Sequence, residues 1–465
     1  STPSNSSAAS DVYKRQIKNN DIAGWRAYVR EAAETFGPGG SFWSDYPTLP
    51  YMPVRFFEIW NEPNIYEFLE PPAGMTRDEC YFNLLKAAYE EIKDVNPEIQ
   101  VVAMNTAGGA THSGISENYI SSDDRNWGHL AFIKAVNARG ATDYYDILAV
   151  HPYTTCGNVC NCNPKCVFPP DEGGVVEGLQ HIREDLAFYG AEDKPIWYTE
   201  VGYPIEYPNT TPITEQQQAD YLIRLHGLAA ANGVQHIEIM YAVDIVYSGD
   251  GSTRKFGLYD GTRLRPQAQA LQYMIEELPD PNSLFTRAID VGVDNHAYLF
   301  TKADSTEVIL CWTEGSETDV ELSVEGERAE LIDLYGNASD LVISGGKVSV
   351  RLSGSPQYVK VYKSQQGVAD IGEETRRDFR VREFIVPNVL VRGGVHVEKI
   401  GEGVREVKIY DIWGKLVVCL GFSVAERYKV WDGKGLGGRE LLPGVYYGEQ
   451  RVGGVIYRQK FLKIK

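Results

Sequence analysis

Two glutamates stand at the ends of segments that have the composition of buried strands. Glu62 lies in the pentapeptide W-N-E-P-N of residues 60–64, after an apolar run, and Glu200 ends the segment P-I-W-Y-T-E of residues 195–200. Side chains at the carboxyl ends of parallel strands meet at one edge of a sheet. Cleavage of a glycosidic bond requires two carboxyl groups that flank the bond, and such a place can supply them. The sequence therefore predicts a carbohydrate-cleaving site if the fold brings the two together.

The segments around these glutamates alternate between helical and extended patterns, which indicates an α/β sheet of parallel strands covered by helices. We expect helices at 21–36, 81–95, 127–138, 175–189, 214–232 and 266–278, and strands at 54–60, 100–105, 145–151, 195–200 and 236–242. A closed (β/α)8 TIM barrel needs eight strands. The five strands predict a partial TIM-barrel domain over residues 17–282 that lacks its first three strands. An open five-stranded sheet, complete in itself, is the alternative.

Residues 1–16 show neither helical nor strand periodicity. They end in D-V-Y-K-R-Q, which resembles translated sequencing-adapter sequence. We expect a non-native or disordered leader here and a true N-terminus further upstream.

After the last expected helix, the sequence pattern changes from alternating helices and strands to short strands alone. Short alternating strands predict a β-sandwich over residues 283–364. Residues 365–380 are polar and charged and are typical of a linker, and residues 381–465 form a second β module. The sandwich strands are expected at 297–301, 307–312, 319–324, 329–334, 347–352 and 357–362.

Four short motifs follow one another at the spacing of barrel units: F-E-I-W-N-E-P-N, I-L-A-V-H-P-Y, I-W-Y-T-E-V-G-Y and F-G-L-Y-D. Together with G-P-G-G-S-F-W they resemble the retaining glycoside hydrolases of clan A, above all family 39 and related cellulase-like or xylosidase-like enzymes. The resemblance covers residues 21–280. Each motif alone is only suggestive, but their order makes the match specific.

The resemblance implies roles for the two glutamates. Glu62 takes the place of the general acid/base at the end of strand four, and Glu200 that of the nucleophile at the end of strand seven. Glu62 then has to be protonated at first, with a raised pKa, while Glu200 stays ionised. Retention predicts carboxyl groups about 5–5.5 Å apart. The implied activity is a retaining O-glycosidase that hydrolyses β-glycosidic bonds of xylan-like or glucan-like plant polysaccharides or oligosaccharides by double displacement.

The resemblance also implies substrate-binding residues. Asn61 matches the residue that holds the sugar 2-hydroxyl. His151 and Tyr153 match a pair that lines the nucleophile, and Tyr153 is expected to donate a hydrogen bond to Glu200 and lower its pKa. Tyr241 stands where many relatives carry a stacking tryptophan. A histidine that merely packs at the rim is the alternative for His151.

Other residues near the motifs are weaker candidates. Trp60, Tyr203 and Tyr247 are possible subsite aromatics, and Glu58 is an interior charge that needs a partner. Relatives supply an arginine and a histidine from early strands that this chain lacks, so we expect the chain as given to be inactive or weak. A non-catalytic carbohydrate-binding or cell-surface adhesion protein is the competing interpretation.

The overall charge argues against a nucleic-acid partner. Lys and Arg total 45 and Asp and Glu total 64, for a net charge of -19, which repels phosphate backbones. No apolar run is long enough to span a bilayer.

Four cysteines, Cys156, Cys160, Cys162 and Cys166, crowd into the loop after the third expected strand. Two disulfides are the favoured interpretation and a structural metal the second. We expect no catalytic metal and no cofactor, since the paired-carboxylate mechanism needs none.

The C-terminal module carries V-K-I-Y-D-I-W-G-K-L-V, a W-D-G turn at residues 431–433 and P-G-V-Y at 443–446. These resemble FlgD-like immunoglobulin-type modules and the C-terminal sorting domains of type IX secretion. The resemblance implies secretion machinery or the cell surface as partner and an extracellular or cell-surface location. A carbohydrate-binding module is the alternative.

Overall fold

The chain divides into two compact units, Ser1–Gln366 and Gly367–Lys465. The expected leader and the whole of the expected linker lie outside the residues that this computed structural model describes. The described residues are 21–154 and 166–363, apart from 48, 50, 113–114, 208–209, 247–252, 280 and 303, and in the second unit 388–390, 395–398, 406–411, 416–423, 428–431, 434–435, 441, 444–452 and 455–463.

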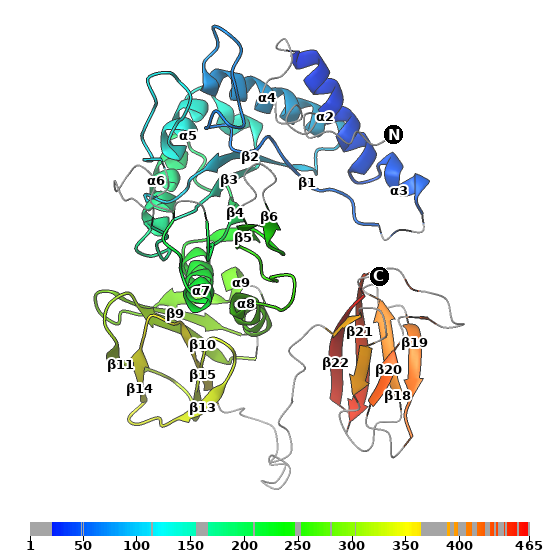
Figure 1. Ribbon diagram of the computed structural model, residues 1–465, viewed down its shortest axis with the longest axis vertical. Coiled ribbons are helices and arrows are strands. Elements are labelled where there is room, and N and C mark those ends of the chain that lie inside the picture. Colours follow the sequence, from blue (N-terminus) through cyan, green and yellow to red (C-terminus); the bar gives the residue numbers. More distant parts are fainter. Residues whose placement is uncertain are drawn as a thin grey trace. The chain divides into compact units, whose positions relative to one another are not determined.

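The first unit contains a parallel sheet in the order β1-β2-β3-β4-β5 (Figure 1). Its strands are β1 (Phe56–Glu58), β2 (Gln100–Ala107), β3 (Ile147–His151), β4 (Ile196–Val201) and β5 (Val234–Ile239). The helices that alternate with them are α2 (Ile22–Phe36), α4 (Arg77–Val95), α5 (His129–Asn137), α6 (Val175–Phe188), α7 (Glu215–Ala231) and α8 (Pro266–Glu277), with short helices α3 (Ser41–Asp45), η2 (Ala141–Tyr144) and α9 (Pro281–Leu284). The prediction of five parallel strands separated by helices is confirmed. The arrangement fits an α/β domain of TIM-barrel type.

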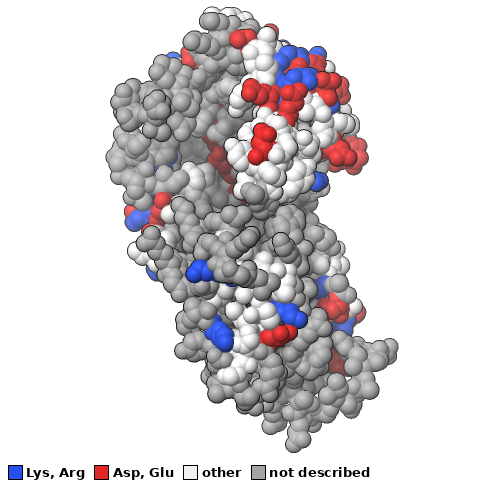
Figure 2. Space-filling model, turned by 90° about the vertical axis from the view of Figure 1, so that its right-hand side faces the viewer, with Lys and Arg blue, Asp and Glu red and all other residues white. Residues whose placement is uncertain are grey.

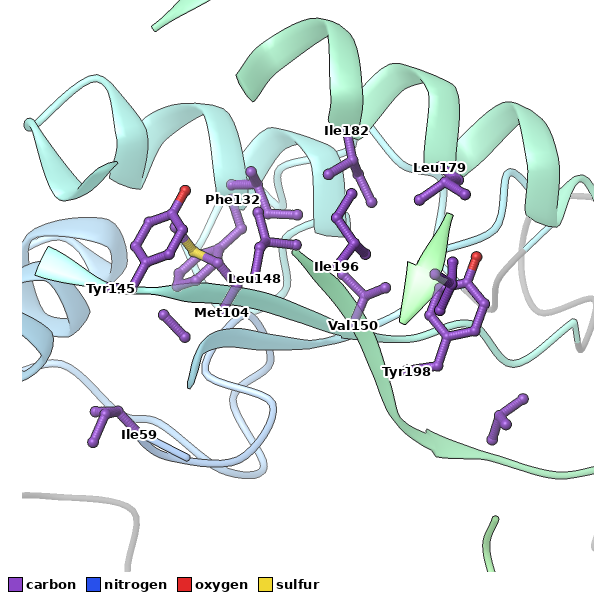
Figure 3. Close-up of a cluster of buried hydrophobic side chains, with 14 of the residues drawn as sticks. Ile59, Met104, Phe132, Tyr145, Leu148, Val150, Leu179, Ile182, Ile196 and Tyr198 are labelled. Atoms are coloured by element: carbon purple, nitrogen blue, oxygen red, sulfur yellow. The ribbon is translucent and has the colours of Figure 1, made fainter. Parts of the chain in front are cut away.

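One face of this sheet packs against helices. Leu179 and Ile182 of α6 face Leu148 and Val150 of β3, all buried (Figure 3). Successive side chains of a strand point to opposite faces. His151, which follows Val150 at the end of β3, is therefore turned to the other face, the inner face of the sheet.

Several boundaries differ from the expected ones, and three of the differences have a local reason. β1 is shorter, because the chain turns out of extended geometry at Trp60 and Glu62, with φ of 71° and 43°. α4 begins earlier, at an N-cap Thr76 followed by acidic residues that favour a helix start. β5 begins earlier because Gly233, with φ of 70°, turns the chain directly out of α7.

The sandwich follows with all six expected strands and two further ones. Its larger sheet has the order β13-β12-β15-β10-β9-β8, and β11 pairs with β14. These strands are β8 (Phe285–Ala288), β9 (Asn295–Thr301), β10 (Glu307–Thr313), β11 (Thr318–Ser323), β12 (Arg328–Ile332), β13 (Ala338–Leu341), β14 (Lys347–Leu352) and β15 (Gln357–Tyr362). In addition, β6 (Ile245–Val246) and β7 (Thr253–Arg254) form a small hairpin before α8.

Helix α7 belongs to two hydrophobic cores at once. Leu222 and Leu225 pack into the core under the parallel sheet, whereas Ile223 and Leu228 pack against Leu310 of the sandwich strand β10 and its neighbours. A capping box of Thr214 and Gln217 starts the helix. The parallel sheet and the sandwich are thus joined through a shared helix.

Two arginines of α2 form ion pairs with acidic residues of α4. Arg26 pairs with Glu90 and Glu91, and Arg30 pairs with Glu91 and Asp94. Figure 2 shows acidic and basic side chains side by side near the top of the face it presents, the end at which Figure 1 places α2 and α4. These ion pairs join α2 to α4, and partly exposed pairs of this kind typically contribute about 0–1 kcal/mol each.

The second unit is a β structure with a core of its own. A five-stranded sheet has the order β16-β22-β21-β18-β19, and β17 pairs with β20. The bounds are β16 (Asn388–Leu390), β17 (Val395–Glu398), β18 (Glu406–Asp411), β19 (Leu416–Gly421), β20 (Tyr428–Trp431), β21 (Gly444–Val452) and β22 (Val455–Lys463). Val407, Ile409 and Tyr446 pack around Trp431, which is almost completely buried.

None of the helices in the described ranges combines the length and the apolar composition that a bilayer crossing requires.

Candidate functional site

The carboxyl ends of β1, β3 and β4 bring the two predicted catalytic glutamates together around His151. One carboxylate oxygen of Glu62, one of Glu200 and one ring nitrogen of His151 all lie within 4.8 Å of one another. Retaining glycosidases hold their two carboxyl groups about 5–5.5 Å apart, and oxygens that lie within this upper limit are compatible with such an arrangement. A glycosidic bond can therefore reach both groups at the same time.

The turn that carries Glu62 is held from β2 rather than by its own strand. The backbone N–H of Glu62 donates to the carbonyl of Asn105 at 2.9 Å. The Asn105 side chain in turn donates to the carbonyls of Ile59 and Trp60, at 3.1 and 3.0 Å. Asn105 is fully buried, so these bonds are shielded from water and the turn keeps one conformation.

A second buried asparagine closes the same turn. Asn64 donates to the carbonyls of Ala107 and Trp127 and accepts from the N–H of Ala107, all between 2.8 and 2.9 Å. Sequence reasoning missed both asparagines as site residues. For Asn64 a signal existed, because it is the last residue of the W-N-E-P-N motif. For Asn105 none did, because its role arises from the register of β2 beside β1.

Glu200 lies at the end of β4, and its side chain is 31 % exposed. Burial raises its pKa and the charge of Glu62 raises it further, while His151 and a hydrogen bond from Tyr153 oppose the rise. The Tyr153 hydroxyl donates to Glu200 Oε2 at 3.2 Å. The expected contact is therefore present, but the net pKa shift of Glu200 is upward, because burial outweighs the hydrogen bond.

His151 is the cation at the centre of the site. Its Nδ1 lies 3.1 Å from Glu62 Oε1 and 3.8 Å from Glu200 Oε2. Burial alone would lower its pKa, but Glu58, Glu62 and Glu200 raise the pKa to about 9. The surrounding carboxylates therefore favour the charged form of the ring.

A cavity of about 510 Å³ lies beside Glu200, whereas Glu62, His151 and Tyr153 are not among its lining residues. Asn61 and Tyr241 line it together with Glu200, and their part in substrate binding stays a prediction. Its lining residues are Glu58, Trp60, Asn61, Thr199, Glu200, Glu238, Ile239, Met240, Tyr241 and Ala242. A volume of this size accommodates a small ligand such as one or two sugar rings. A second pocket of the same volume, lined by residues of α5 and α6 and the 117–118 loop, lies on the helix-covered side of the sheet.

The weaker aromatic candidates have different outcomes. Trp60 lines the cavity, and its indole N–H donates to the carbonyl of Phe68 at 2.9 Å. The expectation for Tyr203 is wrong, because its side chain is 1 % exposed and packs edge-on against Tyr221 of α7. Tyr247 lies outside the described residues.

Most of the cysteine cluster lies outside the described residues, namely Cys156, Cys160 and Cys162. Cys166 is described and is partly exposed. The choice between disulfides and a structural metal therefore stays a prediction.

Comparisons with known proteins agree with this geometry. Residues 46–245, which hold β1 to β5, match the model of glycosyl hydrolases family 39. None of the curated proteins matches the sequence of this chain.

Solved structures share the fold. A family 39 glycoside hydrolase from the gut symbiont Bacteroides cellulosilyticus WH2 is 21 % identical, with a TM-score of 0.51 over 75 % of this chain and 63 % of that chain. A glucosidase from Croceicoccus marinus is 14 % identical, with a TM-score of 0.50 over 74 % of this chain and 75 % of that one. The chain thus spans less than two thirds of the Bacteroides protein.

Proposed function

We propose that this chain, a glycoside hydrolase by descent, hydrolyses β-glycosidic bonds of xylan-like or glucan-like polysaccharides or oligosaccharides with retention of configuration. The observation that carries the proposal is the approach of the Glu62 and Glu200 carboxyl groups to within 4.8 Å beside one imidazole. The family match and the W-N-E-P-N motif support the same assignment.

The proposed reaction has two steps. In the first, Glu200 attacks the anomeric carbon while protonated Glu62 gives its proton to the departing oxygen, so that a glycosyl ester forms on Glu200. In the second, ionised Glu62 takes a proton from water, the water oxygen bonds to the anomeric carbon, and the ester bond breaks. Asn61 and Tyr241 line the cavity in which the sugar would lie.

Covalent trapping tests the proposal directly. A 2-fluoro glycoside with a good leaving group, in xylose and glucose forms, should label the chain once. Peptide mass spectrometry should place the label on Glu200, and Glu200→Gln should abolish it. Saccharide binding without any label would instead support the non-catalytic alternative, a carbohydrate-binding or adhesion protein.

We further propose that the second unit, Gly367–Lys465, serves export or attachment to the cell surface, on the strength of its FlgD-like and sorting-like motifs. In a bacterium with a type IX system, the full chain behind a signal peptide should reach the surface, whereas a chain that ends at Lys363 should not. Equal surface amounts of the two would contradict this role.

A further inference from the structure

Glu58 is a third carboxylate on the inner face of the sheet, and neither proposed chemical step uses it. It ends β1, and its side chain remains 36 % exposed. The Thr199 hydroxyl donates to Glu58 Oε1 at 3.1 Å and so directs this oxygen toward the site. The same oxygen lies 4.0 Å from His151 Nε2.

His151 therefore faces acidic groups with both ring nitrogens. Nδ1 faces the catalytic pair, at 3.1 Å from Glu62 and 3.8 Å from Glu200, and Nε2 faces Glu58. The ring is fully buried, and Nε2 has no hydrogen-bond partner among the described residues. A buried imidazolium needs a compensating charge, and Glu58 is the carboxylate that Nε2 faces.

We propose that Glu58 is a positioning residue that keeps His151 in its charged form, with Nδ1 directed at the catalytic pair. The inference rests on the proposed function, since it assigns a task to His151 in that reaction. Opposite charges within about 4–6 Å stabilise each other's ionised forms. The raised pKa of His151 agrees with this assignment.

The proposed task follows from the charge balance of the two steps. Before the first step Glu200 is ionised and Glu62 is protonated; after it, Glu200 is an ester and Glu62 is ionised. The pair carries one negative charge in both states, and the charge moves from one carboxyl group to the other. An imidazolium beside both groups stabilises the charge in either position, so the transfer needs no rearrangement of the site.

The other ionisable groups near this cluster have partners of their own. Tyr153 donates to Glu200. Glu238 of β5 lines the cavity but lies 3.2 Å from His236 of the same strand. Glu238 is therefore a matched control, a cavity carboxylate that is paired elsewhere.

The first test is an NMR titration of His151 in the full chain, with its signal assigned by a His151→Asn variant. Glu58→Gln should lower the midpoint of His151 by about one to three pH units. Glu58→Asp, which retains the charge, should restore most of the shift, and Glu238→Gln should leave the midpoint in place. An unchanged midpoint in Glu58→Gln, in a variant whose circular dichroism shows a folded chain, would overturn the inference.

The second test is the pH profile of kcat/KM on aryl glycosides. In Glu58→Gln the alkaline limb should move to lower pH, because His151 loses its proton earlier and the catalytic pair then lacks its cation. If the alkaline limb stays at the same pH in Glu58→Gln, Glu58 does not have the proposed positioning role in the reaction. If the unaltered chain neither turns over nor is labelled, the proposed function fails, while the titration still decides whether Glu58 sets the charge of His151.

Discussion

At the scale of single residues, the site consists of carboxyl groups arranged around one buried imidazole. His151 lies between Glu62 and Glu200, and Tyr153 adds a hydrogen bond to Glu200. Among the described residues, His151 is the cation that faces Glu200. The ionisation of each group therefore depends on its neighbours, and substitutions should alter pH profiles as well as rates.

Replacement of Glu62 should reduce turnover more for substrates with poor leaving groups than for substrates with good ones. In Glu62→Ala the departing oxygen receives no proton, so turnover of substrates with poor leaving groups should fall by about 10²–10⁴-fold, with a smaller loss for activated aryl glycosides. Azide should restore part of the rate and yield a glycosyl azide of retained configuration. Steady-state kinetics over a leaving-group series measures this, with the exposed Glu98→Ala as control. Equal losses across the series would contradict the acid/base role.

Replacement of Tyr153 should shift the acidic limb of the pH profile to higher pH. The Tyr153 hydrogen bond lowers the pKa of Glu200, against the larger effect of burial. Tyr153→Phe should therefore raise that pKa further, and activity that needs ionised Glu200 should appear at a pH higher by roughly one unit. The profile of kcat/KM checks this, and Tyr28→Phe on the exposed face of α2 is the control. A shift to lower pH would contradict the assignment.

At the scale of elements, α7 is held between two cores and carries a buried ion pair. Arg224 Nη1 lies 3.1 Å from Asp171 Oδ2, and both side chains are almost completely buried. Arg224 also donates to the carbonyl of Gly354, between two sandwich strands, and the indole N–H of Trp312 donates to Asp171 at 2.8 Å. These contacts connect the helix, the loop before α6 and the sandwich.

Loss of Arg224 should destabilise the first unit strongly. Arg224→Ala leaves Asp171 as an uncompensated buried charge, which typically costs about 3–5 kcal/mol. Urea unfolding should show this loss in the free energy of unfolding. Arg263→Ala is the control, because its pair with Glu215 is exposed at the surface and should contribute little. A loss for Arg224→Ala as small as that for the control would contradict the buried role.

Much of the element order could be predicted from sequence, because apolar strands and amphipathic helices are local patterns. The meeting of Glu62 and Glu200 could also be inferred, because Glu200 lies at the carboxyl end of β4 and Glu62 lies in the turn just after β1 of the same parallel sheet. The part played by Asn105 could not, because it depends on the register of β2 against β1. The burial of Tyr203 escaped prediction for a similar reason, since it depends on how α7, the next helix along the chain, packs against it.

At the scale of the whole molecule, the two units have separate cores. Trp312 is buried in the first, and Trp431 is buried in the second. Because each core is complete within its own unit, we expect two unfolding transitions rather than one.

Calorimetry of tryptophan variants checks this expectation. Trp431→Ala removes a buried indole, a change that typically costs about 3–5 kcal/mol, and should lower the midpoint of one transition only. Trp312→Ala should lower the midpoint of the other. A single transition that both variants shift equally would contradict the division into two units.

Because α7 packs into two hydrophobic cores, the parallel sheet cannot be separated from the sandwich without exposing part of this helix. A gene shortened to the parallel sheet would leave Ile223 and Leu228 facing water, because Leu310 and the rest of the sandwich sheet would be gone. The strand that bears Glu200 leads to this helix, so a loosened α7 would also disturb the nucleophile. Anyone who transplants the site into another protein therefore has to transfer the sandwich with it.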